Sequence, residues 1–264
     1  MDRLGLEIVV CAKQIPDPAD PSELNSETKT LKRDVKLILD ESDSYGVEIG
    51  LQLADAAEQG SVTLVSMAPH EETNGLRTAL AMGAEDAILV SDPRLLGSDS
   101  LATAKVLAAA ITQASPDLVI AATESSDGYT GTVPEQIAEL LGWPSVTFAK
   151  AVEVQNGSVH VQRQTEEGYD EVVCPMPCVV SVTAGVVEPR FPSFKGIMAA
   201  KSKPLAQPSL EDLAIPAESV GWAGAGQEIT AIVDAPVRQA GEVVEDEGDA
   251  HERLIAFLEE LKVL

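Results

Sequence analysis

Short β-branched runs alternate with longer helical patterns through the first half of the chain, and this alternation constrains the fold most. Four apolar runs have the length and composition of buried strands, at residues 7–12, 61–66, 86–90 and 117–122. Four other segments carry apolar positions at helical spacing, at residues 43–58, 71–82, 98–114 and 132–141. Strands that are apolar throughout are typical of parallel sheets, which are buried on both faces. The pattern predicts an α/β fold, with a doubly wound, mostly parallel sheet.

The pattern changes in the second half of the chain. Residues 151–155 and 158–162 alternate with period two around Asn156 and Gly157, which predicts an added β-hairpin, and residues 178–182 predict one more strand. From residue 188 onwards, prolines and glycines interrupt short segments, and the helical patterns there are residues 209–213 and 249–262. Asp249 and Glu252 have the spacing of a capping box.

A tail this extended cannot enclose a core of its own. It must lie on its own domain or on another chain. We therefore expect an α/β domain at residues 1–187 and an extended C-terminal arm at residues 188–264.

The charge balance excludes several kinds of partner. The chain has 43 acidic residues against 18 Lys and Arg, a net charge of −25. Nucleic acid is not an expected partner, because binding its phosphates needs clustered Lys and Arg. An anionic membrane surface is disfavoured for the same reason. The sequence lacks both a signal-peptide pattern and an apolar run of the ~20 residues that a membrane span needs, so we expect a cytoplasmic protein.

Ligands of open parallel sheets bind beyond the carboxyl ends of the strands. Three segments occupy such places, at residues 11–17, 66–69 and 123–135. In the third, Gly128 and Gly131 let the backbone turn tightly and approach a ligand. Thr132 and Glu135 have the spacing of a capping box at the start of a helix, whose N–H groups can bind an anion. A phosphate or diphosphate would fit against residues 130–133; an ordinary strand–helix turn with a good cap is an equal interpretation.

The sequence contains no pattern of a catalytic or metal site. Its three cysteines, Cys11, Cys174 and Cys178, stand in apolar surroundings and are expected to be reduced core residues. Its three histidines are expected at the surface, at His70, His160 and His251. The scattered carboxylates are expected to be solvated. We therefore predict neither catalytic residues nor metal ligands.

Residues 188–198, with the sequence EPRFPSFKGIM, form the most unusual segment. Two of the four phenylalanines of the chain, Phe191 and Phe194, lie there between prolines and a glycine. An aromatic ring exposed on a proline-stiffened loop is a good anchor for a partner protein. Burial of Phe194 in a partner pocket would contribute ~2 kcal/mol. The alternative interpretation is that both rings fold back onto the core.

Four motifs, in order over nearly the whole chain, resemble the electron-transfer flavoprotein β subunit family. They are IVVCAKQIPD at residues 8–17, LRTALAMGAED at 76–86, VQRQTEEG at 161–168 continuing to PCVVSV at 177–182, and EPRFPSFKGIMAAK at 188–201. The last is the strongest match.

The resemblance implies an electron carrier and not an enzyme. Family members form a heterodimer with an α subunit that holds the redox FAD. The dimer collects electrons from flavin dehydrogenases, acyl-CoA dehydrogenases among them, and passes them to a membrane quinone oxidoreductase. Most β subunits hold AMP, whereas those of electron-bifurcating complexes hold a second FAD that accepts hydride from NADH. We favour AMP here and keep FAD as the alternative. A stand-alone nucleotide-binding protein would need neither the arm nor the Phe194 loop.

The resemblance also implies which residues form the two sites. Nucleotide-binding residues are expected at Cys11, Ala12, Asp40, Met67, Asp127, Gly128, Thr130, Gly131, Thr132 and Val133. Asp40 stands where Asn is common in the family, and Thr132 stands where Gln is usual. Phe194 is expected to be the docking anchor, in a surface that also contains Pro192, Ile197, Met198, Lys201 and Lys203. The two lysines match positions that are methylated in some members, and the arm is expected to pack on the α subunit.

Overall fold

The computed structural model describes residues 5–20, 23–68, 70–233, 241, 243, 245, 246 and 248–263. The chain divides into two compact units, Met1–Thr230 and Ala231–Leu264. The second unit contains the helix α7 (Ala250–Glu260), and the first contains the sheets and the other helices. Among the described residues, no helix has both the length and the apolar character needed to cross a membrane.

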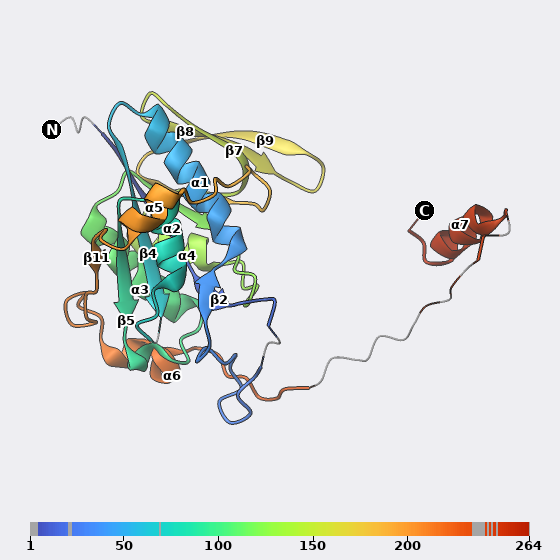
Figure 1. Ribbon diagram of the computed structural model, residues 1–264, viewed down its shortest axis with the longest axis horizontal. Helices are drawn as coiled ribbons and strands as arrows, with labels where there is room; N and C mark the ends of the chain where they lie inside the picture. Colours follow the sequence, from blue (N-terminus) through green and yellow to red (C-terminus); the bar gives the residue numbers. More distant parts are fainter. Residues whose placement is uncertain are drawn as a thin grey trace. The chain divides into compact units, whose positions relative to one another are not determined.

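A nine-stranded sheet forms the centre of the first unit (Figure 1). Its strands are β1 (Leu6–Cys11), β4 (Gly60–Ala68), β5 (Asp86–Ser91), β6 (Leu118–Ala122), β7 (Ser145–Gln155), β8 (Ser158–Gln164), β9 (Tyr169–Pro175), β10 (Cys178–Val182) and β11 (Leu205–Ala206). They lie in the order β11-β5-β4-β1-β6-β10-β7-β8-β9. Every pair from β11 to β7 is parallel, whereas β8 and β9 add on in antiparallel fashion. The strands β2 (Gln14–Pro16) and β3 (Leu37–Leu39) pair separately as a small antiparallel sheet.

Helices cover both faces of the sheet, so the predicted doubly wound α/β fold is confirmed. The helices α1 (Glu41–Ala56), α2 (Asn74–Met82) and α5 (Phe194–Ala200) share one apolar core, which includes Ile8 and Val10 of β1. The helices α3 (Ser100–Ala114) and α4 (Val133–Leu141) share the other core, with Val9 and Cys11. Alternate residues of one strand thus enter opposite cores, because side chains alternate across a strand. This two-sided burial explains why the parallel strands are apolar throughout.

The predicted hairpin is confirmed and is larger than expected. Asn156 and Gly157 have φ values of 51° and 78°, as a type I′ turn between β7 and β8 requires. A third strand, β9, follows and was not predicted. Its Tyr169, Glu171 and Val173 are exposed, so it lacks the long apolar run by which the buried strands were recognised.

The arm packs on the first unit as far as residue 230. Leu205 and Ala206 of β11 pair with β5, and Leu210 and Leu213 are buried in the core beside α3. Residues 209–213 form a hydrogen-bonded turn and not the expected helix.

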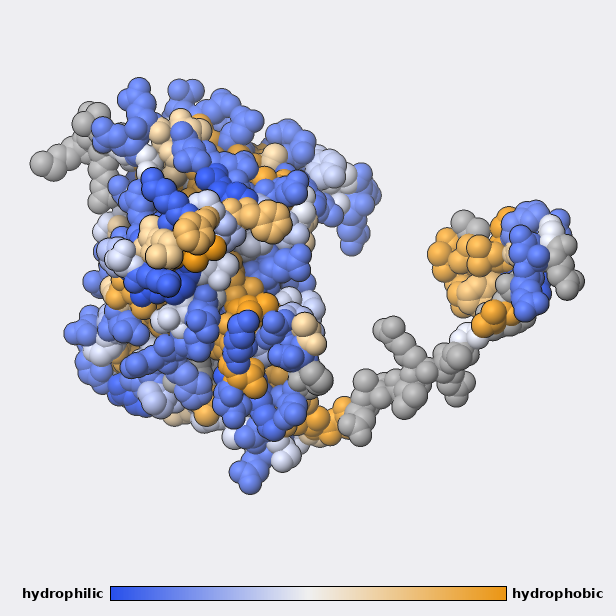
Figure 2. Space-filling view, viewed as in Figure 1, coloured by the Kyte–Doolittle hydropathy of each residue, from blue (hydrophilic) through white to orange (hydrophobic). Residues whose placement is uncertain are grey.

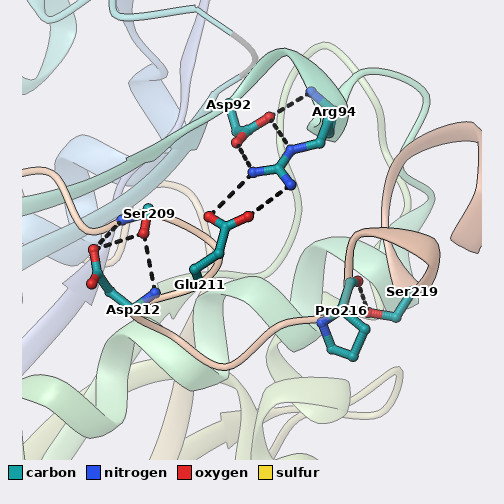
Figure 3. A network of polar contacts seen from close by, with 7 residues as sticks. All are labelled: Asp92, Arg94, Ser209, Glu211, Asp212, Pro216 and Ser219. Atoms are coloured by element: carbon teal, nitrogen blue, oxygen red, sulfur yellow. Dashed lines mark hydrogen bonds and ion pairs between the residues drawn. The ribbon is translucent and has the colours of Figure 1, made fainter.

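Polar contacts hold this part of the arm in place (Figure 3). Arg94 pairs with Asp92 at 2.6 Å and with Glu211 at 2.8 Å, so it links the turn after β5 to the arm. Residues 188–230 thus belong to the first compact unit, and residues 231–264 form the second. Packing of the remaining arm on a partner chain stays a prediction.

The two predicted capping boxes are wrong. Thr132 and Asp249 do precede α4 and α7, but neither side chain makes a capping hydrogen bond. A capping residue normally has an extended backbone, which directs its side-chain oxygen at the first N–H groups. The ψ angles of Thr132 and Asp249 are −7° and 4°, so their backbones are not extended. The first N–H groups of α4 are therefore left without this acceptor.

Candidate functional site

A cavity of about 280 Å³ lies at the carboxyl ends of β1, β4 and β6. From β1 the chain continues through β4 and β5, which lie to one side of β1 within the sheet. The strand β6 then pairs with the opposite edge of β1. The strand order thus reverses between β1 and β6. Ligands of open α/β sheets bind at such a switch point.

Six of the ten expected nucleotide-binding residues line this cavity: Cys11, Ala12, Met67, Thr130, Gly131 and Val133. Cys11 and Met67 lie at the carboxyl ends of β1 and β4, Ala12 follows β1, and the other three come from the segment between β6 and α4 and from the first residue of α4. Asp40, Asp127, Gly128 and Thr132 are not among its lining residues. The three segments singled out in the sequence thus contribute to one cavity, and nucleotide binding by these residues stays a prediction.

Asp40 is buried and braces two loops against each other. Its carboxylate accepts hydrogen bonds from the Ser42 nitrogen at the start of α1 at 3.0 Å, and from Ser126 nitrogen and Oγ at 2.8 and 2.9 Å. Ser126 belongs to the segment after β6. The carboxylate thereby fixes the loop beside the cavity.

Asp127 positions a cation at the cavity. Its carboxylate pairs with Lys13 Nζ at 2.5 Å and also with Arg33, while Lys13 Nζ donates to Ser125 Oγ at 3.1 Å. Burial would raise the pKa of Asp127, but the charges and hydrogen bonds of Lys13 and Arg33 outweigh burial and lower it. Asp127 is therefore a stable anion, and Lys13, which it holds, lines the cavity. Gly128 lies beside the same ammonium: a Cβ there would be 3.6 Å from Lys13 Nζ.

Asp43 is a buried carboxyl in the cavity wall, and no motif in the sequence indicated it. It lies in the first turn of α1, and its carboxyl group accepts a hydrogen bond from the backbone nitrogen of Lys13 at 2.6 Å. Burial and the charge of Asp40 raise its pKa to about 8. Burial also raises the pKa of the neighbouring Cys11 thiol to about 12, with Asp43 adding to the shift. Cys11 is thus an unreactive thiol at neutral pH.

A second wall of the cavity was also not predicted. It consists of Ser98, Asp99, Ser100 and Thr103 at the start of α3, together with Gln227 of the arm. The α3 residues follow β5, so the carboxyl-end rule would have found them if it had been applied to every strand. Gln227 lies beside them because the Gly226 nitrogen donates to Asp99 Oδ2 at 2.8 Å. Nothing in the spacing of residues indicated that contact.

The cavity brings together groups that can bind an anion. The first N–H groups of α4 have no side-chain cap, and a helix N-terminus with free N–H groups binds anions. Gly131, with a φ of 65°, and Lys13 line the same cavity. The volume of about 280 Å³ lies near the lower limit of small-molecule sites, roughly 300 Å³.

The described residues contain no cluster of His, Cys, Asp or Glu that could hold a metal ion. All three cysteines are free and buried, as predicted. His70 and His251 are exposed, and His160 is half-buried.

The expected docking segment exposes its aromatic rings. Phe191 and Phe194 are 89% and 82% exposed, so the interpretation that they fold back onto the core is wrong. The segment is not entirely a loop, because α5 begins at Phe194, and Ser193 caps it by accepting from the Gly196 nitrogen at 3.0 Å. Ile197 and Met198 are also exposed. Apolar side chains gather over α5 on a face that is otherwise mostly hydrophilic (Figure 2).

The two lysines beyond α5 differ in their surroundings. Lys201 is exposed. The ammonium of Lys203 instead donates to the carbonyl oxygens of Leu80, Gly83 and Ala84 at 2.9, 3.2 and 2.6 Å. Pro192 is half-buried at the base of the segment.

Comparison with known proteins identifies the family. The sequence model of the electron transfer flavoprotein domain matches residues 28–213. The electron transfer flavoprotein subunit beta of Mycobacterium tuberculosis is 39% identical over 263 residues, which cover 97% of this chain and 99% of that protein.

The chain belongs to the electron transfer flavoprotein β subunit family. The resemblance of the four motifs is thus confirmed. The Megasphaera elsdenii subunit beta is 34% identical over 95% of both chains. The caffeyl-CoA reductase-Etf complex subunit CarD of Acetobacterium woodii is 32% identical over 90% of this chain and 92% of its own. Membership assigns an electron-carrier role to this β subunit, and an α subunit as its partner in a heterodimer.

Proposed function

We propose that this β subunit holds a structural AMP, associates with an α subunit that carries the redox FAD, and presents Phe194 to flavin dehydrogenases. The reduced heterodimer then passes its electrons to a membrane quinone oxidoreductase. The observation that supports this most is the cavity at the switch point of the sheet. The uncapped N-terminus of α4 and the side chain of Lys13 both line it.

The AMP phosphate would lie against residues 130–133, where N–H groups and the Lys13 ammonium can bind a dianion. Cys11, Ala12 and Met67 would surround the less polar part of the nucleotide. Asp40 and Asp127 would act indirectly, by fixing the loop and the lysine. The small volume of the cavity favours AMP over FAD.

The chain itself would carry out no bond chemistry. The flavin supplies the electron chemistry when it is bound to the α subunit, and the protein supplies its position and surroundings. The role of this chain is to assemble the dimer and to bring the flavin close to that of a dehydrogenase.

The helix α7 supports the α subunit as the partner of the arm. Leu254, Ile255 and Phe257 of α7 and the adjacent Leu261 are all about half exposed, and none of the described residues of α7 is buried. An amphipathic helix with an uncovered apolar face is stable when that face packs on another surface.

Electron acceptance by the purified heterodimer tests the docking role. A flavin dehydrogenase and its substrate should reduce the FAD of the wild-type dimer. Phe194→Ala should raise the KM for the dehydrogenase roughly 30-fold, the equivalent of ~2 kcal/mol of lost burial. FAD and AMP content should not change. Unchanged reduction rates at limiting dehydrogenase would refute Phe194 as the anchor.

One comparison favours a second candidate function, since a relative belongs to a complex named for a reductase. In that alternative, the β subunit of an electron-bifurcating complex would hold a second FAD that accepts hydride from NADH. NADH-dependent reduction of a flavin in the heterodimer, absent from a plain electron carrier, distinguishes the two.

A further inference from the structure

The C-terminal ends of α2 and α5 are held together by two cations, each of which caps the other helix. We propose that Lys203 and Arg77 are positioning residues, which form a reciprocal clamp that fixes α5 on α2 and so orients Phe194 for docking. The docking half of this inference rests on the proposed function. The clamp itself rests only on contacts within the first unit.

Lys203 caps the C-terminal end of α2, although it lies 119 residues beyond Ala84 in the sequence. Its ammonium donates to the carbonyl oxygens of Leu80, Gly83 and Ala84, which lie at or just beyond the last turn of α2. The carbonyls of the last turn of a helix lack partners within it and carry its negative dipole end; Leu80 lies in that turn of α2, and Gly83 is its capping residue. The last turn of Asn74–Met82 holds no basic residue of its own. Lys203 therefore supplies the cation that this helix end lacks.

Arg77 makes the reverse contact. Its guanidinium Nη1 donates to the carbonyl oxygens of Ala200 and Lys203, at 2.7 and 3.1 Å. Ala200 is the last residue of α5, whose final turn likewise holds no basic residue. Each helix thus receives at its C-terminus a cation from the segment that contains the other.

A close backbone contact completes the clamp. A Cβ built on Gly196 would lie 2.3 Å from the carbonyl oxygen of Ala81, far too close for any side chain. Glycine at position 196 therefore allows α5 to approach the end of α2 near enough for both cations to reach their acceptors.

The helix α5 depends on this clamp because the helix is short and buries little of its own side-chain surface. It has seven residues, far fewer than the roughly 12–15 that an isolated helix needs to be stable. Ala200 is its buried residue, whereas Phe194, Ile197 and Met198 project from the protein. Burial lowers the pKa of Lys203 despite the opposing charge of Glu85, which agrees with an ammonium turned into the protein.

The first arm of the test measures the order of α5 in the intact heterodimer. Lys203→Met keeps the length of the side chain and removes all three donors. Hydrogen exchange of the α5 amides should become at least about tenfold faster in this variant. Arg77→Met should have a similar effect, Lys203→Arg a smaller one, and the exposed Lys36→Met none. Unchanged exchange in both Lys203→Met and Arg77→Met would overturn the clamp.

The second arm measures electron acceptance from a dehydrogenase. Lys203→Met should raise the KM for the dehydrogenase about tenfold, the equivalent of about 1.4 kcal/mol, with little change in kcat or in FAD content. Lys203→Arg should restore part of the loss. If Phe194→Ala raises KM but Lys203→Met does not, α5 does not need the clamp for docking and the positioning role is overturned. If Phe194→Ala itself has no effect, the docking assignment fails, and the exchange experiment alone decides on the clamp.

Discussion

At the scale of single residues, the carboxylates around the cavity show the limit of motif-based assignment. Asp40 was expected to touch the nucleotide, yet its oxygens bind Ser42 and Ser126. Asp127 was expected there too, and it holds Lys13 and Arg33. Both residues contact segments that line the cavity. The motifs could not give the direction of each side chain, because the partners lie 86 and 94 residues away in the sequence.

Asp43 should make the stability of the chain depend on pH. Its folded-state pKa of about 8 lies above its ordinary value of 3.8. Between these values the unfolded carboxyl is ionised and the folded one is protonated, so the stability of the wild type falls as pH rises through this window. Asp43→Asn removes the titration. The free energy of unfolding is measured for the variant and for the wild type, and the wild-type value is subtracted. This difference should increase from pH 4 to pH 8, by at most about 1.4 kcal/mol per pH unit.

Chemical unfolding of both proteins across this range provides the measurement. Asp170→Asn is a suitable control, because Asp170 is exposed on β9. A difference between Asp43→Asn and the wild type that does not vary with pH would show that Asp43 is ionised in the folded protein.

At the scale of elements, the strands and helices that were predicted are those with long apolar runs or strong turn signals. β1, β4, β5, β6 and β10 are buried on both faces, so hydropathy alone located them. β2, β3 and β11 have two or three residues each and take their partners from distant segments. Such short strands leave no periodicity to detect. The helix α5 was missed because its exposed Phe194 and Gly196 suggested a loop.

Two glycines in helices should respond to alanine in opposite ways. A Cβ at Gly46 in α1 would meet Ile120 and Val10 at 3.5 and 3.6 Å, which is ordinary contact. Gly46→Ala should therefore stabilise the chain by up to about 1 kcal/mol through helix propensity. A Cβ at Gly75 in α2 would lie 2.7 Å from the Leu39 nitrogen, so Gly75→Ala should destabilise it by about 1–3 kcal/mol.

Urea unfolding of the two variants measures both effects, and each serves as the control for the other. Equal shifts of the same sign would contradict the close packing of α2 on β3.

At the scale of the whole molecule, the acidic excess is the dominant property. With a net charge of −25, the carboxylates repel one another. This repulsion is stronger in the folded state, where they are closer together than in the unfolded chain. Added salt shortens the range of this repulsion, from about 10 Å at 0.1 M to about 3 Å at 1 M.

We therefore expect the stability of the protein to rise between about 0.1 and 1 M KCl. Thermal unfolding of the heterodimer at several KCl concentrations measures it. A midpoint that falls over this range would mean that attractive ion pairs, such as that of Arg190 with Glu48, outweigh the net repulsion.

We propose that this chain contributes a nucleotide-binding scaffold and holds no redox group of its own. Denaturing the purified heterodimer and counting the released nucleotides tests it most directly. We predict one FAD and one AMP for each dimer, since the cavity of about 280 Å³ suits a mononucleotide. Two FAD and no AMP for each dimer would rule out this role and establish the electron-bifurcating alternative.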